Sequence, residues 1–288
     1  MGSDAIFSHI TVLGTGLIGG SFALAARQQF PEIEITGWDR EEVLAAAAAR
    51  GAVQRTSAKL EDGLRGADLV YIALPVGVAM DLLPVIAAHA APGALVTDAC
   101  GTKTAVCRAA GQHFTGGARF LGGHPVAGKE TSGIGHADAG LFRGAVYALV
   151  GREDDADPRV RKFVALVRAL GAEPKWCDAE THDWALGIVS HLPQLVSVAL
   201  ARVVLDETDE TGLPVSLAGS GLRDTMRLAG SPYGAWRDVC LTNRDNIARA
   251  LDRVAQAIEH LRTSLTSREL EDEFRAANEL YKILRELQ

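Results

Sequence analysis

The fold is decided by the stretch His9-Ile10-Thr11-Val12-Leu13-Gly14-Thr15-Gly16-Leu17-Ile18-Gly19. It opens with a short apolar run rich in β-branched residues and continues into a turn of the form Gly-x-Gly-x-x-Gly. A helix is predicted directly after the turn, over 17–29. This strand–turn–helix context is what dinucleotide binding requires, because the glycines allow a tight turn, close approach of a pyrophosphate and close helix–strand packing. The phosphates would then face the N-terminus of the helix.

The residues that follow extend this unit into a sheet. Further strands are predicted over 34–38, 67–74 and 94–98, with helices over 41–50 and 78–89 between them. Strands that alternate with helices of about ten residues indicate a doubly wound parallel sheet of the Rossmann type. The first half of the chain is therefore expected to be an α/β domain that binds a dinucleotide.

Asp39 ends the second strand, twenty residues beyond Gly19. A carboxylate at this place binds the ribose hydroxyls of NAD and repels the 2′-phosphate of NADP. The neighbouring Arg40 leaves NADP possible, because its guanidinium could bind that phosphate or stack on the adenine. The residues that we expect to contact NAD are Gly14, Gly16, Leu17, Ile18, Gly19, Asp39, Arg40, Leu74 and Pro75.

The second half changes character after the acidic, turn-rich segment 151–158. A helix over 158–170 and a strand over 173–177 lead into long helices, which are predicted over 181–206, 233–265 and 267–287. Pro193 implies a kink in the first of these. Wide apolar stripes on long helices favour an all-α domain that buries surface against a partner chain. We therefore expect an α/β domain over 1–152 and a helical substrate and dimerisation domain over 153–288.

Composition excludes several classes of protein. The 288 residues carry a net charge of −7, which argues against nucleic acid as the partner. The four cysteines show neither a Cys-x-x-Cys pair nor metal-ligand spacing, so we expect no metal site and a cytoplasmic location. The N-terminal residues lack a basic region, and we expect no stretch to approach the ~20 apolar residues of a membrane-spanning helix.

One histidine lies in a stretch rich in glycine, Gly122-Gly123-His124-Pro125-Val126-Ala127-Gly128-Lys129-Glu130-Thr131-Ser132-Gly133. It is expected at the end of a strand over 120–121, where the glycines let a small ligand come close. A titratable imidazole beside a redox cofactor is the minimum apparatus for hydride transfer from an alcohol. The alternative is a histidine at a strand end that bonds only to backbone.

Four ordered motifs carry a resemblance to a known family. They are the glycine turn Gly14–Ser21, the segment His124–Gly133, the run Ser190-His191-Leu192-Pro193, and the segment Gly219–Ala229. Together they resemble the prephenate and arogenate dehydrogenases of tyrosine biosynthesis, over residues 10 to about 246. The resemblance implies oxidative decarboxylation of an anionic cyclohexadienol, with hydride transfer to NAD, by a homodimer.

The resemblance also implies roles for individual residues. His124 would accept the proton of the substrate hydroxyl, and Arg227 would hold a substrate carboxylate in a bidentate clamp. His191 would line the cleft between the domains, and Glu130 would lie at the mouth of the site. Without the resemblance, Arg227 reads as a solvated charge at a helix end, His191 as a core histidine, and Glu130 as an exposed loop carboxylate.

Two positions depart from the family pattern. Many members have histidine where this chain has Gln194, near the side chain of the substrate, which leaves the choice between prephenate and arogenate open. The serine that helps to orient the catalytic histidine is replaced by Gly101, so either the adjacent Thr102 or a water would take over its role.

The sequence leaves two alternative functions. A β-hydroxyacid-type dehydrogenase shares the layout but needs a lysine on the helical domain, and the chain has no lysine between Trp184 and Tyr281. A non-catalytic NAD-sensing dimer would have no use for His124 and Arg227.

Overall fold

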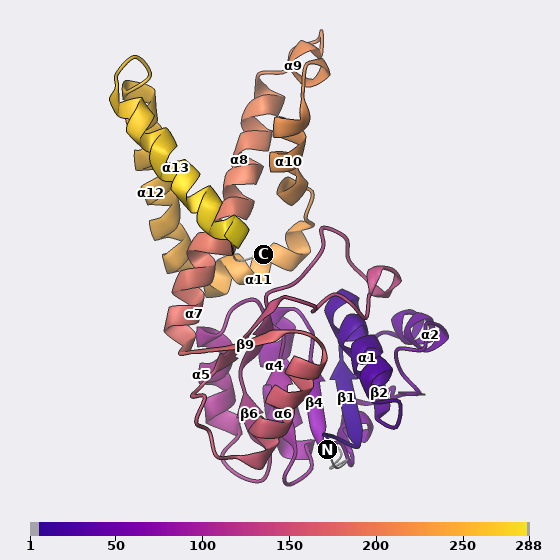
Figure 1. Ribbon diagram of the computed structural model, residues 1–288. Coiled ribbons are helices and arrows are strands. Elements are labelled where there is room, and N and C mark those ends of the chain that lie inside the picture. Colours follow the sequence, from indigo (N-terminus) through magenta and orange to yellow (C-terminus); the bar gives the residue numbers. More distant parts are fainter. Residues whose placement is uncertain (1–5, 287–288) are drawn as a thin grey trace.

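The computed structural model describes residues 6–286. It consists of an α/β domain from which two pairs of helices extend as separate arms (Figure 1). In chain order the elements are β1 (His9–Leu13), α1 (Leu17–Gln29), β2 (Glu34–Trp38), α2 (Glu41–Ala49), β3 (Arg55–Thr56), α3 (Leu60–Leu64), β4 (Leu69–Ile72), α4 (Val76–His89), β5 (Leu95–Asp98), α5 (Thr104–His113), β6 (Arg119–Leu121), β7 (Gly123–Pro125), η1 (Ile134–His136), β8 (Val146–Val150), α6 (Pro158–Ala169), β9 (Glu173–Cys177), α7 (Ala179–Leu186), η2 (Gly187–His191), α8 (Leu192–Asp206), α9 (Leu213–Ser216), α10 (Ser220–Ala229), α11 (Tyr233–Thr242), α12 (Arg244–Thr263) and α13 (Glu269–Glu286).

The main sheet has six parallel strands in the order β3-β2-β1-β4-β5-β6. This confirms the predicted doubly wound sheet. The strand order reverses direction at β1, where Leu13 is paired with Ile72 of β4. Ligands of such sheets bind beyond the carboxyl ends of the strands at this reversal, and the glycine turn begins there.

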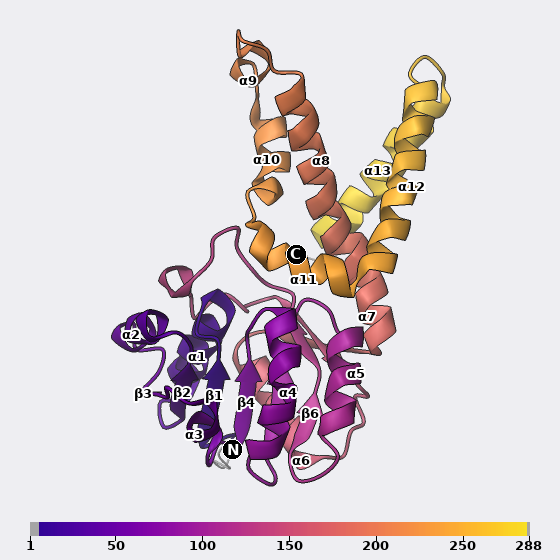
Figure 2. The ribbon, with the colours of Figure 1, turned by 180° about the vertical axis from the view of Figure 1, so that it is seen from behind.

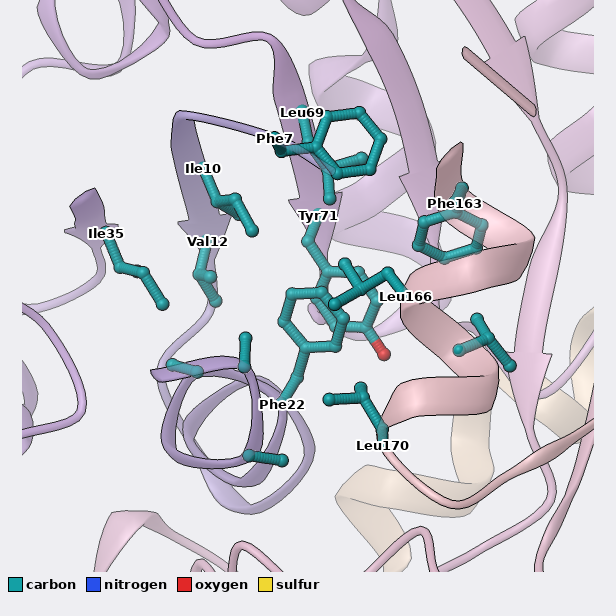
Figure 3. Packing of buried hydrophobic residues seen from close by; sticks show 14 of the residues in the cluster. Phe7, Ile10, Val12, Phe22, Ile35, Leu69, Tyr71, Phe163, Leu166 and Leu170 are labelled. Atoms are coloured by element: carbon teal, nitrogen blue, oxygen red, sulfur yellow. The ribbon is translucent and has the colours of Figure 1, made fainter. Parts of the chain in front are cut away.

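Helices cover both faces of the sheet, as Figures 1 and 2 show from opposite sides. On one face α1 and α6 pack against β1 and β4, with Phe22 stacked on Tyr71 at 3.7 Å between ring centroids (Figure 3). On the other face α3, α4 and α5 enclose a second buried cluster. Because each fully buried large apolar side chain contributes roughly 1.5–3 kcal/mol, these two clusters hold the sheet that carries the glycine turn.

His124 does not lie at the end of the strand over 120–121, as the sequence suggested. That strand, β6, ends at Leu121, and His124 sits inside the separate strand β7. β7 belongs to a second sheet, in which β8 pairs antiparallel with β7 and parallel with β9. The sequence analysis missed this sheet because its strand of three residues, Gly123–Pro125, carries no periodic signal.

The segment over 158–177 packs with the first domain. Phe163 and Leu166 of α6 belong to the same buried cluster as Ile10 of β1, and β9 extends the sheet of β7 and β8. This packing favours a domain boundary near Asp178, later than the boundary expected after residue 152.

The helical half departs from the prediction in two places. The helix predicted over 181–206 contains a π-helical segment, Gly187–His191, directly before Pro193, whose missing amide disturbs the regular hydrogen-bond ladder. The helix predicted over 233–265 is two helices, because the chain turns at Asn243 between α11 and α12. The last predicted helix is found as α13, while its expected end at Leu287 lies outside the described residues.

The continuous helix Ala179–Asp206 is long and apolar enough, by length and composition, to cross a membrane. The expectation that no stretch comes near this length was therefore wrong. The same helix carries the polar side chains His182, Asp183, His191 and Gln194, all of them buried and bonded to other groups of the protein. These contacts bind the part of the helix up to Gln194 to neighbouring segments of the protein, whereas apolar side chains beyond it, such as Val203, are exposed.

Candidate active site

The glycine turn has the geometry that close approach of a ligand requires. Gly14 has a positive φ of 87°, and a side chain there would collide with the carbonyl of Ala73. A side chain on Gly19 would collide with the carbonyl of Gly14, so the third glycine keeps α1 close to the turn. By contrast, nothing lies within 4 Å of a Cβ built on Gly16. The second glycine thus leaves open space beside the start of α1, where a pyrophosphate fits.

Asp39 lies at the end of β2 and faces this turn. The backbone amide of Thr15 donates to Oδ2 of Asp39 over 2.7 Å, and that of Arg40 donates to Oδ1 over 2.8 Å. The Arg40 side chain points into solvent and pairs with Glu42 at 3.4 Å. A cavity of about 920 Å³ opens between these groups; of the predicted cofactor residues it is lined by Gly14, Gly16, Asp39, Arg40, Leu74 and Pro75.

A second cavity of about 660 Å³ brings together residues from both domains. His124 and Glu130 come from the α/β domain, whereas Gln194 and Arg227 come from α8 and α10. The predicted cofactor residues Leu17 and Ile18 line this cavity as well, and Ser132 lines both cavities. The two cavities are therefore neighbours at the carboxyl end of the main sheet.

His124 is partly buried at the wall of the second cavity. Its Nδ1 lies 2.9 Å from Nε2 of His182, and Nδ1 of His182 lies 2.8 Å from Oδ1 of Asp183. Burial, and then the neighbouring His182, hold the pKa of His124 well below its usual value. An imidazole in this state is neutral and can accept a proton.

His182 and Asp183 were missed by the sequence analysis. The only local signal is a histidine next to an aspartate in the first turns of a helix, which is an ordinary composition there. Their role depends on the packing of α7 against β7 and α5, and no pattern in the sequence specifies that packing.

A buried ion pair lies directly behind His124. Lys103 and Asp98 are both fully buried and pair with each other. Nζ of Lys103 also donates to the carbonyl of Gly123 over 2.7 Å, and the amide of Gly123 donates to Asp98 over 3.1 Å. The pair therefore fixes both backbone groups of the residue that precedes His124.

The predicted helper Thr102 points elsewhere. Its hydroxyl is bonded to that of Thr242 in α11 at 2.7 Å, and the side chain is fully buried. Neither Thr102 nor Gly101 lines the cavity that contains His124. A hydroxyl that orients His124 would have to face that residue. The hydrogen bond to Thr242 instead holds the Thr102 hydroxyl away from the cavity.

His191 is buried in the π-helical segment beside the site. Asn243 donates to its Nδ1 over 3.0 Å, and its ring meets that of Trp236 edge-on. Burial lowers the pKa of His191 to about 4, so the ring is neutral. Trp236 lines the second cavity whereas His191 does not, which places His191 behind the cavity wall.

Arg227, Glu130 and Gln194 line the same cavity as His124. Arg227 pairs with Glu130, a contact that joins the loop after β7 to α10. The Glu130 backbone amide and the Arg227 guanidinium lower the pKa of that carboxyl. Gln194 is almost fully buried, and its amide nitrogen donates to the carbonyl of Leu228 over 2.8 Å.

Within residues 6–286, no group of three or more His, Cys, Asp or Glu side chains is placed to hold a metal ion. The four cysteines are free thiols. Burial raises the pKa of the Cys107 thiol to about 12. The thiol therefore stays protonated near neutral pH and is a poor nucleophile.

Comparison with known proteins gives matches over both halves of the chain. Residues 22–174 match the family model of the prephenate dehydrogenase nucleotide-binding domain, and residues 178–286 match that of the prephenate dehydrogenase dimerization domain. A prephenate dehydrogenase of Lactococcus lactis is 37% identical over 268 residues, covering 87% of this chain and 73% of that protein.

Two solved structures are similar over nearly the whole chain. One is prephenate dehydrogenase from Aquifex aeolicus in complex with hydroxyphenyl propionate and NAD+, with a TM-score of 0.85, 27% identity, and coverage of 96% of this chain and 97% of that one. The other is Synechocystis arogenate dehydrogenase, with a TM-score of 0.78, 28% identity, and coverage of 97% and 100%.

Proposed function

This chain belongs to the prephenate dehydrogenase family, and from that premise we propose that it oxidises and decarboxylates a cyclohexadienol, prephenate or arogenate, with NAD as the hydride acceptor. The products are 4-hydroxyphenylpyruvate from prephenate and tyrosine from arogenate. Hydride leaves the carbinol carbon, the hydroxyl gives up its proton, and carbon dioxide departs as the ring becomes aromatic. Because aromatisation drives the reaction, the enzyme mainly supplies positioning and one proton acceptor.

The observation that carries this proposal is the shared cavity of His124 and Arg227. A neutral imidazole and a guanidinium line one space of about 660 Å³, next to the space beside the glycine turn. An anionic alcohol bound by the guanidinium would have its hydroxyl within the same cavity as the imidazole. This combination serves a dehydrogenase directly and has no purpose in a sensor that only binds NAD.

The residues of the first cavity suit NAD. The open space at Gly16 and the start of α1 would hold the pyrophosphate, and Asp39 would bind the ribose hydroxyls. Bound there, NAD supplies the hydride acceptor. We propose a preference for NAD over NADP, because the carboxylate of Asp39 faces the turn, whereas the exposed Arg40 side chain, which lines the same cavity, is paired with Glu42.

Arg227 is proposed to bind a carboxylate of the substrate. It is more than half exposed, and its partner Glu130 lies on the loop after β7. A substrate carboxylate can share the guanidinium, which has five donors, or replace Glu130. Glu130 would therefore stand at the entrance of the site, as the family resemblance suggests.

Gln194 is proposed to favour arogenate at least as much as prephenate. One of its two amide hydrogens is committed to the carbonyl of Leu228, so the side-chain oxygen and one N–H are left for a ligand. The oxygen can accept a hydrogen bond from the ammonium group of arogenate. The remaining N–H can donate to a carboxylate or to the keto group of prephenate, so the carboxamide serves arogenate at least as well.

The test is a steady-state assay of prephenate and arogenate, each with NAD and with NADP. We expect NADH formation with at least one substrate, a kcat/KM for arogenate equal to or above that for prephenate, and lower values with NADP. Absence of oxidation of both substrates with either cofactor would contradict the proposed function. A clear preference for prephenate would contradict the role given to Gln194 alone.

We also propose a cytoplasmic homodimer. The second half of the chain is a dimerisation domain by its family match, and its helical arms expose many large apolar side chains. Those on α8, α12 and α13 include Val198, Val203, Leu205, Ile258, Phe274, Leu280, Ile283 and Leu284. An apolar surface of this extent, exposed in the single chain, is typical of a face that a partner chain covers. Light scattering at micromolar concentration is expected to give twice the chain mass, and a monomeric mass would contradict it.

A further inference from the structure

The hydrogen bonds to Asp183 fix the protonation state and the orientation of its carboxylate. The backbone amide of Lys103 donates to its Oδ1 over 2.7 Å, and that of Thr104 donates to its Oδ2 over 2.9 Å. These amides can only donate, so both carboxylate oxygens act as acceptors. Burial alone would raise the pKa of Asp183, but the His182 side chain and the two amides bring it below its usual value. Asp183 is therefore an anion held at the start of α5.

An anionic acceptor determines where His182 carries its proton. The His182 side chain is fully buried, and its Nδ1 is 2.8 Å from Oδ1 of Asp183. If Nδ1 lacked a proton, two acceptors would face each other without water between them. Nδ1 therefore donates to Asp183. In the neutral ring Nε2 is then a bare acceptor.

The bare Nε2 of His182 in turn determines which ring nitrogen of His124 carries a proton. Nδ1 of His124 lies 2.9 Å from this Nε2, and the two rings meet edge-on with 5.1 Å between centroids. A hydrogen bond over this distance needs one proton, and only Nδ1 of His124 can supply it. The lone pair of His124 is then on Nε2, the ring nitrogen that this bond leaves free.

The geometry points to His182 and Asp183 as a positioning pair that fixes His124 in the tautomer with a free Nε2. Neither residue touches the cavity that contains His124, so both act through it. The substrate hydroxyl passes its proton to Nε2 of His124, and the proton on Nδ1 stays in the bond to His182. The charge that develops on His124 is stabilised by the lone pair of His182 and, one ring further, by Asp183.

The first measurement is independent of turnover. The tautomer of His124 can be read from the ¹⁵N shifts of the ring in the cofactor-free protein. We expect the form protonated on Nδ1 in the native protein. In His182→Leu the group that accepts from Nδ1 of His124 is removed, so the fraction of His124 protonated on Nδ1 is expected to fall. A native ring protonated on Nε2, or a tautomer population unchanged in His182→Leu, would overturn the inference.

The second measurement is kinetic and rests on the proposed function. Asp183→Asn is expected to lower kcat by about 10²–10⁴-fold while KM changes little, because the anion that stabilises the charge developing on His124 is lost and the binding groups are untouched. The matched control is Asp178→Asn in the capping position of the same helix, where asparagine caps equally well and kcat should stay native. An equal loss in both variants would mean that the effect is structural.

If Asp183→Asn does not fold, a second pair of variants tests the same inference. In His182→Gln the side-chain oxygen can still accept from Nδ1 of His124, whereas in His182→Leu it cannot. We expect His182→Gln to retain a clearly higher kcat than His182→Leu, and equal values would overturn the inference. If the native protein turned over neither substrate, the proposed function would fail, while the tautomer measurement would still test the pair.

Discussion

Replacing His124 by asparagine is expected to lower kcat by about 10²–10⁴-fold, the range that a positioned general base contributes. Asparagine has no titratable nitrogen, so the hydroxyl proton would have to leave to water. KM should change far less, because Arg227 and Gln194, the residues proposed to bind the substrate, are not altered. The measurement is steady-state kinetics with the better substrate of the two and NAD.

The matched control for this variant is His113→Asn, at an exposed position near the end of α5. It removes a histidine far from the two cavities and should leave kcat native. A His124→Asn variant that turns over at the native rate would show that the proton leaves by another route, and the mechanism proposed above would be wrong.

Lys103→Met is expected to cost about 3–5 kcal/mol of folding stability, because it leaves the carboxylate of Asp98 buried without its partner. Burial alone would lower the pKa of Lys103, but the Asp98 carboxylate more than compensates and raises it, so the native pair is ionic. Methionine fills similar space, which separates the loss of charge from the loss of packing. Urea unfolding measures the difference.

Two further variants make this result specific. Lys103→Met combined with Asp98→Asn removes both charges and should recover part of the stability, since a neutral amide costs less to bury. Lys162→Met, at an exposed position of α6, should change stability by no more than about 0.5 kcal/mol. A loss in Lys103→Met no larger than that of Lys162→Met would contradict the role of the buried pair.

The parts of the fold that were predicted correctly are those specified by local sequence. The glycine turn needs Gly14 at a positive φ and no side chain at Gly19, and only glycine meets both demands. The apolar strands and their connecting helices follow from periodicity in the same way. The break at Asn243 was missed because the apolar pattern of 233–265 continues across it, whereas the side chain of Asn243 bonds to the carbonyl of Asp183 and to His191, far from it in the sequence.

The site was predicted only in part, because tertiary contacts between distant segments specify the rest of it. His124, Gln194, Arg227 and Glu130 were expected together and line one cavity. Their roles stay predictions. Thr102 was expected beside His124 because it is next to the replaced serine in the sequence, but its contact to Thr242 arises from α11, far along the chain. His182 and Asp183 could not be singled out, since their importance comes from tertiary contacts to His124 and to the start of α5.

The uninterrupted helix from Ala179 to Asp206 limits how this molecule can move. Its first turns are bonded to the α/β domain through Asp183, and its later turns form one of the two arms (Figure 1). A hinge rotation between the domains would therefore drag His182 away from His124. We therefore expect substrate entry and product release to use smaller parts of the cavity wall, namely the loop that carries Glu130 and the short helix α10. Turnover in this protein should then be coupled to loop opening, while the two domains keep a constant relative orientation.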